Sequence, residues 1–154
     1  MITSILEYLE SSASRYPDKT AFADLDATCT FEELRLRARR VGTALAEHFA
    51  PRNPVPVFME KSVDTIGMFM GAVYAGCFYV LLDTKQPAAR ISQILDILDS
   101  NVIVTSNKYQ KDLEKLEFKG TILLTEELEK TPEDSFVLKS IRDQALDTDP
   151  LYGI

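Results

Sequence analysis

The sequence predicts an α/β fold in which a mostly parallel sheet is flanked by helices. From residue 55 to residue 125, short apolar segments alternate with helical patterns in the order βαβαβαβ. Such alternation indicates βαβ units, in which parallel strands are joined by crossover helices. The length of 154 residues, with 45% hydrophobic and 27% charged residues, suits one domain with a substantial core. We therefore expect a single α/β domain over residues 1–154.

Residues 1–54 are expected to form a helix, two short strands and a capped helix. The first helix has a periodic apolar face that ends at Pro17. The strand candidates Thr20–Asp24 and Ala27–Thr30 are separated by two residues, as in a hairpin. Apolar periodicity then predicts a second helix, which runs as far as Phe49 and is ended by the proline-containing segment 51–54.

The start of that second helix carries the clearest local signal in the chain. Thr30-Phe31-Glu32-Glu33 has the pattern of a capping box. In such a box the Thr30 side chain accepts from the Glu33 backbone N–H, and the Glu33 side chain reaches back to the Thr30 N–H. Cys29 and Leu34 are placed to pack on each other across this cap.

An uncharged run from Thr65 to Leu82 admits two interpretations. A transmembrane helix becomes a candidate at roughly 18 consecutive apolar residues, so a membrane span is one of them. The other is a buried helix over Val63–Ala75, a stop at Gly76 and a buried strand over Phe78–Leu82. We favour the second, because the run becomes aromatic and branched after Gly76 and lacks basic flanks.

The remaining elements of the βαβαβαβ core are shorter. The strands are predicted at Val57–Met59, Val102–Thr105 and Thr121–Leu124, in addition to Phe78–Leu82. One helix should begin near Pro87, and a polar helix should cover Tyr109–Leu116. Residues 126–154 form an acidic tail with one helix predicted near Phe136–Ala145.

The composition argues against several classes of function. A formal net charge of −7 disfavours a nucleic-acid binder, and we interpret the basic cluster Arg35, Arg37, Arg39 and Arg40 as a solvated helix face paired with Glu32 and Glu33. The two cysteines show no metal-ligand spacing and are expected to be buried and reduced. No signal sequence opens the chain, so a cytoplasmic location is the default expectation.

The loops that follow the predicted strands contain little chemistry. None has a glycine-rich phosphate loop, and neither catalytic residues nor cofactor or metal ligands are assigned to this chain. The only histidine, His48, is expected to have a capping or surface role. Asp83 is expected to serve in a turn or as a helix cap rather than as a general base.

Three segments in order resemble the amino-acid adenylation domains of adenylate-forming ligases. Cys29-Thr30-Phe31-Glu32-Glu33-Leu34 resembles the first core motif of that family, Leu-Thr-Tyr-x-Glu-Leu. The segment from Tyr74 to Asp83, which contains Ala75 and Gly76, resembles the second, Lys-Ala-Gly-x-Ala-Tyr-Val-Pro-Ile/Leu-Asp. Pro87-Ala88-Ala89-Arg90-Ile91 resembles the following Pro-x-x-Arg-Ile/Leu segment. The chain departs from these motifs at four positions, with Phe31 for Tyr, Tyr74 for Lys, Phe78 for Ala and Leu81 for Pro.

The resemblance implies a fold, an activity and partners. It identifies the chain as the truncated N-terminal portion of a domain like those of nonribosomal peptide synthetases and D-alanine:carrier-protein ligases. Such enzymes use ATP and magnesium to form an acyl-adenylate and then load a phosphopantetheine thiol on a carrier protein. The family's reactive parts lie beyond Ile154, so we expect Thr30, Glu33, Ala75, Gly76, Asp83, Pro87 and Arg90 to be structural and the chain alone to be inactive.

An alternative of another class is a stand-alone α/β binding or interaction module without catalysis. The two hypotheses differ in the surface that they require. A portion of a larger domain should expose apolar surface that the remainder of the adenylation domain would cover, and it could self-associate there. A stand-alone module should have a polar surface.

Overall fold

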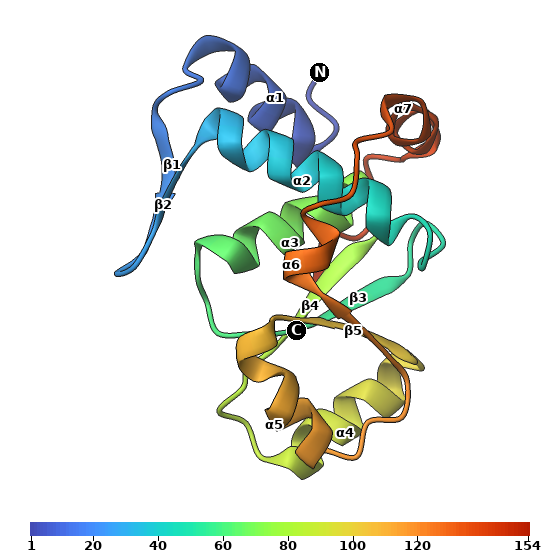
Figure 1. The fold of residues 1–154 in the computed structure, drawn as a ribbon. Helices are drawn as coiled ribbons and strands as arrows, with labels where there is room; N and C mark the ends of the chain where they lie inside the picture. Colours follow the sequence, from blue (N-terminus) through green and yellow to red (C-terminus); the bar gives the residue numbers. More distant parts are fainter.

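A five-stranded parallel sheet lies at the centre of the structure, a computed structural model that describes residues 1–154 (Figure 1). The strand order is β6-β5-β3-β4-β7, and every pairing within this sheet is parallel. A separate antiparallel hairpin, β1-β2, projects from one side (Figure 1). The strands are β1 (Thr20–Ala23), β2 (Thr28–Thr30), β3 (Pro54–Phe58), β4 (Phe78–Leu82), β5 (Val102–Thr105), β6 (Thr121–Leu124) and β7 (Tyr152–Gly153).

Helices cover both faces of the sheet, which confirms the predicted fold class. In Figure 1, α2 and α3 lie above the sheet and α4 and α5 lie below it. The helices are α1 (Ile5–Arg15), α2 (Phe31–Leu45), α3 (Val63–Tyr74), α4 (Ala88–Leu98), α5 (Gln110–Lys115), α6 (Thr125–Leu128) and α7 (Ser135–Gln144), with a 3₁₀ turn at Asn107–Tyr109. Because β4 and β5 flank β3 on opposite sides, the chain reverses direction across the sheet at β3.

Two apolar clusters hold these layers together. The larger contains 22 buried residues from the sheet and the helices on its two faces. The smaller contains eight and joins α1, β2, α2, α3 and α7. Helices α2 and α3 approach closely at Gly71, where an added Cβ would lie only 2.4 Å from Val41 Cγ1.

The uncharged run is divided as predicted. α3 ends at Tyr74, Gly76 follows it, and β4 begins at Phe78. No helix of the structure is long and apolar enough to span a membrane. The interpretation of this run as a buried helix followed by a buried strand is therefore the one that the structure adopts.

The prediction for the end of α2 was wrong. The helix stops at Leu45 rather than Phe49, and residues 46–48 form a turn in which the His48 and Phe49 N–H groups both donate to the Leu45 carbonyl, at 3.0 and 2.9 Å. Phe49 is nevertheless buried, so its apolar periodicity reflects packing after the helix has ended. His48 is exposed, as expected for a surface residue.

Strand β3 also begins earlier than predicted and contains Pro54 and Pro56. Asn53 directs its carbonyl to the Phe78 N–H on β4. Since alternate residues of a parallel strand face opposite neighbours, both prolines face β5. Pairing with β5 starts only at Val57, so the missing proline N–H groups break no ladder bond.

The interpretation of the arginine cluster as a solvated helix face was right in part: the predicted Glu32–Arg35 pair forms at 2.7 Å, but three of the four arginines are not exposed. The side chains of Arg35, Arg37 and Arg39 are only 24%, 28% and 18% exposed, and they contact carboxylates on α1, on α3 and around α6 and α7. The predicted Glu33–Arg37 pair does not form, because the capping box holds the Glu33 carboxylate at the Thr30 N–H. Arg35, Arg37 and Arg39 join elements to one another, and Arg40 is the only one of the four that is exposed.

Candidate functional site

The first motif forms the junction between the hairpin and α2. The Glu33 N–H donates to Thr30 Oγ1 at 3.1 Å, and the Thr30 N–H donates to Glu33 Oε2 at 2.8 Å. Both halves of the predicted capping box are therefore present. Cys29 and Leu34, each 3% exposed, belong to the same apolar cluster beneath the cap. These residues set the direction in which α2 leaves the hairpin.

The second motif ends α3 and starts β4. Ala75 is the C-cap residue, and Gly76 has a φ of 74°, in the left-handed region that glycine tolerates best. The Gly76 N–H donates to the Val73 carbonyl and the Cys77 N–H to the Ala72 carbonyl, both at 2.9 Å. This pair of bonds is a Schellman motif. The chain can therefore turn from helix to strand within three residues.

The loop after β4 holds Asp83, Pro87 and Arg90. Asp83 forms a turn, because its side chain accepts from the Lys85 N–H at 2.9 Å and its carbonyl accepts from the Gln86 N–H at 3.0 Å. It does not cap a helix, since α4 begins only at Ala88 with Pro87 in the N-cap position. Arg90 is exposed and forms no ion pair in the structure. The motif residues thus occupy separate junctions and are not gathered into one reactive site.

The carboxyl ends of β3 and β5, where α/β proteins commonly bind ligands, are hydrogen-bonded to each other. Buried Thr105 donates from its hydroxyl to the Phe58 carbonyl at 2.7 Å, which joins the ends of the two strands. The Asn107 N–H is taken by the Glu126 carboxylate. No three His, Cys, Asp or Glu side chains in the structure are grouped so that they could hold a metal ion.

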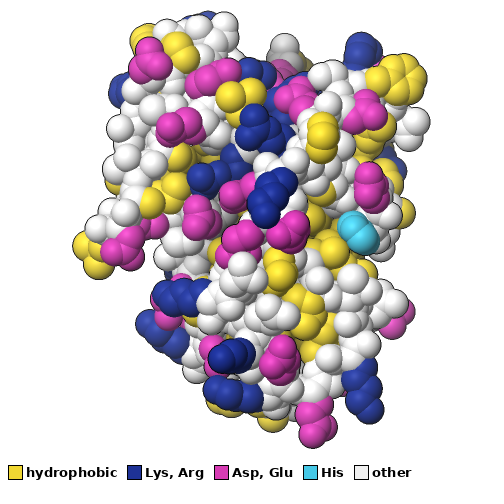
Figure 2. Space-filling model, viewed as in Figure 1, with side chains coloured by type: hydrophobic (Ala, Val, Ile, Leu, Met, Phe, Trp, Pro, Cys, Tyr) yellow, Lys and Arg dark blue, Asp and Glu magenta, His cyan; other side chains and the backbone are white.

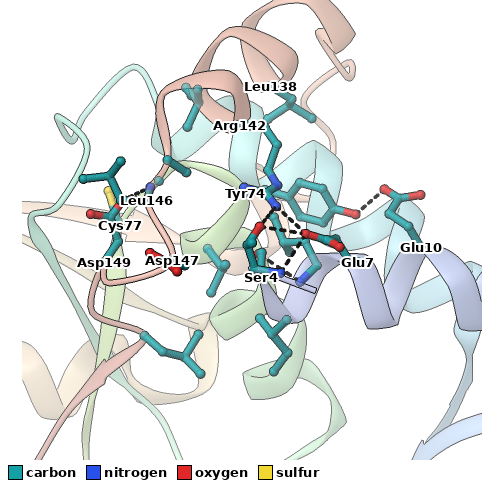
Figure 3. Close-up of a pocket in the computed structure, with 18 of the residues that line it drawn as sticks. Ser4, Glu7, Glu10, Tyr74, Cys77, Leu138, Arg142, Leu146, Asp147 and Asp149 are labelled. Atoms are coloured by element: carbon teal, nitrogen blue, oxygen red, sulfur yellow. Dashed lines mark hydrogen bonds and ion pairs between the residues drawn. The ribbon is translucent and has the colours of Figure 1, made fainter. Parts of the chain in front are cut away.

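A cavity of about 510 Å³ lies elsewhere, at the opposite end of β4 (Figure 3). Its walls come from the start of α1, the α3–β4 junction, α7 and the segment 145–151. Sequence reasoning did not find this cavity. Its lining residues lie far apart in the chain, and of the motif residues predicted to be structural only Gly76 is among them.

One wall of the cavity is a hydrogen-bonded cluster around Glu7. The Thr3 N–H and hydroxyl donate to Glu7 Oε1 at 3.1 and 2.9 Å, and Arg142 Nη2 donates to the same atom at 2.7 Å. These donors, the Thr3 backbone first among them, lower the pKa of Glu7 below its ordinary value. Glu7 is therefore held as a carboxylate that ties α1 to α7 (Figure 3).

A second cluster surrounds Tyr74, which stands where the family motif has lysine. The Tyr74 hydroxyl bonds to Glu10 Oε1, and the Arg39 guanidinium lies 5.5 Å from the centre of the Tyr74 ring. Arg39 also pairs with Glu10 at 3.0 Å and with Glu133 at 2.6 Å. Burial, followed by the bond to Glu10, raises the pKa of Tyr74, so this phenol stays protonated as a donor.

Acidic and basic side chains are interspersed on the face shown in Figure 2, with no broad basic area there. Both cysteines are buried and unpaired with each other, and burial raises the pKa of the Cys77 thiol to about 11. The structure is a parallel α/β scaffold, a class of architecture shared by many nucleotide-dependent enzymes.

Comparison with known proteins narrows this class. A sequence model of the AMP-binding enzyme family matches residues 9–152. The chain is 31% identical over 109 residues to the NRPS-like oxidoreductase fscA of Fusarium equiseti, a match that covers 70% of this chain and 11% of that protein. It is 30% identical over 139 residues to one of the mycosubtilin synthase proteins of Bacillus subtilis, which covers 90% of this chain and 5% of that protein.

Solved structures agree with this match. A nonribosomal peptide synthetase with AMPPNP bound aligns with a TM-score of 0.75 and 26% identity, over 82% of this chain and 14% of that one. O-succinylbenzoate coenzyme A synthetase from Bacillus subtilis, with ATP and a magnesium ion, aligns with a TM-score of 0.70 at 22% identity, over 82% of this chain and 34% of that one. At that identity the second likeness concerns the fold alone.

The chain therefore belongs to the AMP-binding enzyme family, and within it corresponds to the N-terminal part of a nonribosomal-peptide-synthetase-like adenylation domain. Its parallel sheet matches the N-terminal subdomain of adenylate-forming enzymes. The chain spans 11% and 5% of the two curated relatives named above.

Proposed function

We propose that this chain is the N-terminal α/β scaffold of an ATP-dependent ligase. The ligase would activate a carboxylate, in particular that of an amino acid, as an acyl-adenylate and pass it to the phosphopantetheine thiol of a carrier protein. The observation that carries the proposal is the α3–β4 junction: Ala75 and Gly76 adopt the helix-stop geometry that the resembling motif requires. The family match over residues 9–152 supports the same assignment.

ATP and magnesium do not fit the residues of this chain. Activation of a carboxylate by ATP needs three kinds of group held close together: hydrogen-bond donors to the phosphates, a positively charged side chain and a metal ion. Here the candidate loop residue Asp83 is used in a turn, Thr105 bonds the Phe58 carbonyl, and no metal-ligand group is present. We therefore propose that the chain alone neither holds ATP tightly nor makes an adenylate, and that other segments of the enzyme supply those groups.

The proposed partners are the remainder of an adenylation domain and a carrier protein. Exposed apolar side chains support a docking role for the last segment of the chain: Leu146 and Tyr152 are 58% and 55% exposed. Without a covering partner, such side chains favour self-association. We also propose a cytoplasmic location, for which the buried free thiols Cys29 and Cys77 are the support.

Amino-acid-dependent exchange of labelled pyrophosphate into ATP tests the proposal. The chain alone should give no exchange above a control without protein. A hybrid in which the chain replaces the matching segment of the mycosubtilin synthase relative should give exchange, with the unaltered relative as the positive control. Exchange by the chain alone contradicts the scaffold role, and a folded but inactive hybrid contradicts membership of the catalytic unit.

A stand-alone binding module is the second candidate, and the cavity of about 510 Å³ is the observation that favours it. Pockets of about 300–1,000 Å³ are typical of small-molecule sites. A hybrid that is folded and inactive, together with a monodisperse chain that binds a ligand, would favour this candidate over the ligase.

A further inference from the structure

We propose that Glu129, the C-cap residue of α6, is a proton-sensitive contact between α6 and the α2–α3 pair. The charged carboxylate weakens the attachment of α6 at neutral pH, and the carboxyl group attaches α6 more firmly once it has bound a proton. The observation behind the proposal is that two carboxylates, Glu129 and Asp64, share the single guanidinium of Arg37. The inference concerns residues of the present chain alone and does not depend on the ligase assignment.

Arg37 reaches from α2 across α3 to both acids. Its side chain passes over Gly67, where an added Cβ would lie 2.7 Å from Arg37 Cδ. Arg37 Nη1 donates to Asp64 Oδ1 at 2.9 Å. Arg37 Nε lies 3.5 Å from Glu129 Oε1, which is longer than the distance of about 2.7–2.9 Å in a charge-assisted hydrogen bond. The guanidinium is therefore bonded to Asp64 and only attracts Glu129.

Glu129 is the less hydrated of the two acids. Its side chain is 31% exposed, against 59% for Asp64. Burial raises the pKa of Glu129, and the negative charges of Asp64 and of Glu126 on α6 raise it further, whereas the positive charge of Arg37 lowers it. These three side chains, from α2, α3 and α6, are the charged groups that act on Glu129. The net result is a carboxyl group that binds a proton more readily than an ordinary glutamate.

The attachment of α6 also affects the carboxyl edge of the sheet. Thr125 and Leu128 are buried, at 4% and 5% exposure, and α6 contacts α2. Glu126 of the same helix accepts from the Asn107 N–H, just after β5, at 3.1 and 3.2 Å. A looser α6 should therefore also loosen the segment that follows β5.

The direction of the pH effect follows from the raised pKa of Glu129. Such a carboxyl group takes up a proton more readily in the folded than in the unfolded chain. Its contribution to the free energy of unfolding should therefore increase as the pH falls from 7 towards 4.5, the ordinary pKa value. Glu7 and Glu133, whose pKa values are lowered, act in the opposite direction. The effect must therefore be measured as a difference between variants.

Three measurements on the whole chain test the proposal. The pKa of Glu129, measured by NMR titration of the ¹³C-labelled carboxyl groups, should lie above 4.5. Glu129→Gln, which removes the charge and keeps the shape, should have a higher urea midpoint than the original chain at pH 7, and this advantage should shrink as the pH falls to 4.5. The Asn107 amide should exchange its hydrogen more slowly in Glu129→Gln than in the original chain at pH 7.

Two further variants make the test specific to the shared guanidinium. Asp64→Asn removes the competing carboxylate, so it should lower the pKa of Glu129 whatever it does to overall stability. Glu127→Gln removes the same charge from α6 at an exposed side chain that pairs only with Lys130, at 3.2 Å. This control should bring no gain in the urea midpoint at pH 7. Circular dichroism melting verifies that each variant folds.

The proposal is overturned if Glu129 titrates at or below 4.5, or if its pKa is unchanged in Asp64→Asn. It is also overturned if Glu129→Gln is no more stable than the original chain at pH 7, or if Glu127→Gln gains as much. Unchanged exchange of the Asn107 amide would overturn the coupling of α6 to the carboxyl edge of the sheet.

Discussion

Replacement of Gly76 by alanine tests whether the α3–β4 junction depends on backbone geometry. Gly76 has a φ of 74° and follows the last turn of α3. A Cβ at this position would lie 2.8 Å from Ile141 Cγ2 and 3.3 Å from Pro51 Cβ. The substitution therefore imposes both an unfavourable dihedral angle and a steric contact with α7.

The expected cost can be assembled from these two effects. A left-handed conformation costs a residue with a Cβ about 1–2 kcal/mol. The contact with Ile141 adds up to about 1 kcal/mol, because only the end of a side chain must move. Alanine also restricts the unfolded chain, which offsets about 0.4–1 kcal/mol. We expect Gly76→Ala to lower the free energy of unfolding by about 1–2 kcal/mol.

Urea denaturation followed by circular dichroism measures this change. With a slope of about 2 kcal/mol per molar urea, typical of a small domain, the midpoint should fall by about 0.5–1 M. Gly76→Asn carries the same Cβ but tolerates the left-handed region better, so it should be more stable than Gly76→Ala.

A matched control lies within α3 itself. Gly67→Ala meets no dihedral penalty, but its Cβ would lie 2.7 Å from Arg37 Cδ, so the shift of that side chain offsets the helix-propensity gain of about 1 kcal/mol, and the variant should lose less stability than Gly76→Ala. The reasoning is refuted if Gly76→Ala is as stable as the original chain, or if the asparagine variant is the less stable of the two.

Three further predictions concern the same scaffold. Thr30→Ala removes one half of the capping box and should lower the free energy of unfolding by about 1 kcal/mol, measured by urea denaturation, whereas Thr30→Ser should retain most of it. Cys29 and Cys77 should resist a thiol reagent such as DTNB at pH 8 in the native protein and react fully in urea, since both are buried and their thiol pKa values are raised; rapid native labelling would contradict the structure. The hydrogen bonds and charge of Arg39 lower the pKa of Glu133. The ionised Glu133 carboxylate should therefore stabilise the fold fully above pH 4.5, and this stabilisation should be lost as the pH falls below 4.5. Glu133→Gln should flatten that part of the curve of unfolding free energy against pH.

The junctions of this fold could be predicted because their physics is local. The capping box needs only Thr30 and Glu33, three residues apart, and the stop at Gly76 needs only a glycine between an apolar helix and an apolar strand. The same reasoning failed at Phe49, where apolar periodicity continued although the helix had ended. The Phe49 N–H still donates to the Leu45 carbonyl, four residues earlier, but residues 46–48 form a turn, and packing rather than regular helical backbone keeps the Phe49 side chain buried.

Features that depend on distant partners could not be predicted. β7 consists of two residues, and it exists because Tyr152 and Gly153 lie beside Tyr79 and Val80 of β4. The cavity wall likewise depends on the bond between Arg142 and Glu7, residues 135 positions apart. No pattern within a short window encodes either contact. The one local sign of the cavity was the tyrosine at position 74 in a motif that usually has lysine.

The presence of tyrosine rather than lysine at position 74 is explained by the charged side chains around it. Tyr74 is 6% exposed, with its ring beside the Arg39 guanidinium and its hydroxyl on Glu10. A lysine here would bring a second positive charge next to Arg39, and burial would disfavour its charged form. Tyrosine instead offers a neutral donor to Glu10 and an aromatic face to the guanidinium. The motif therefore preserves its backbone geometry at Gly76 while its first position is adapted to an arginine that joins α1, α2 and the segment before α7.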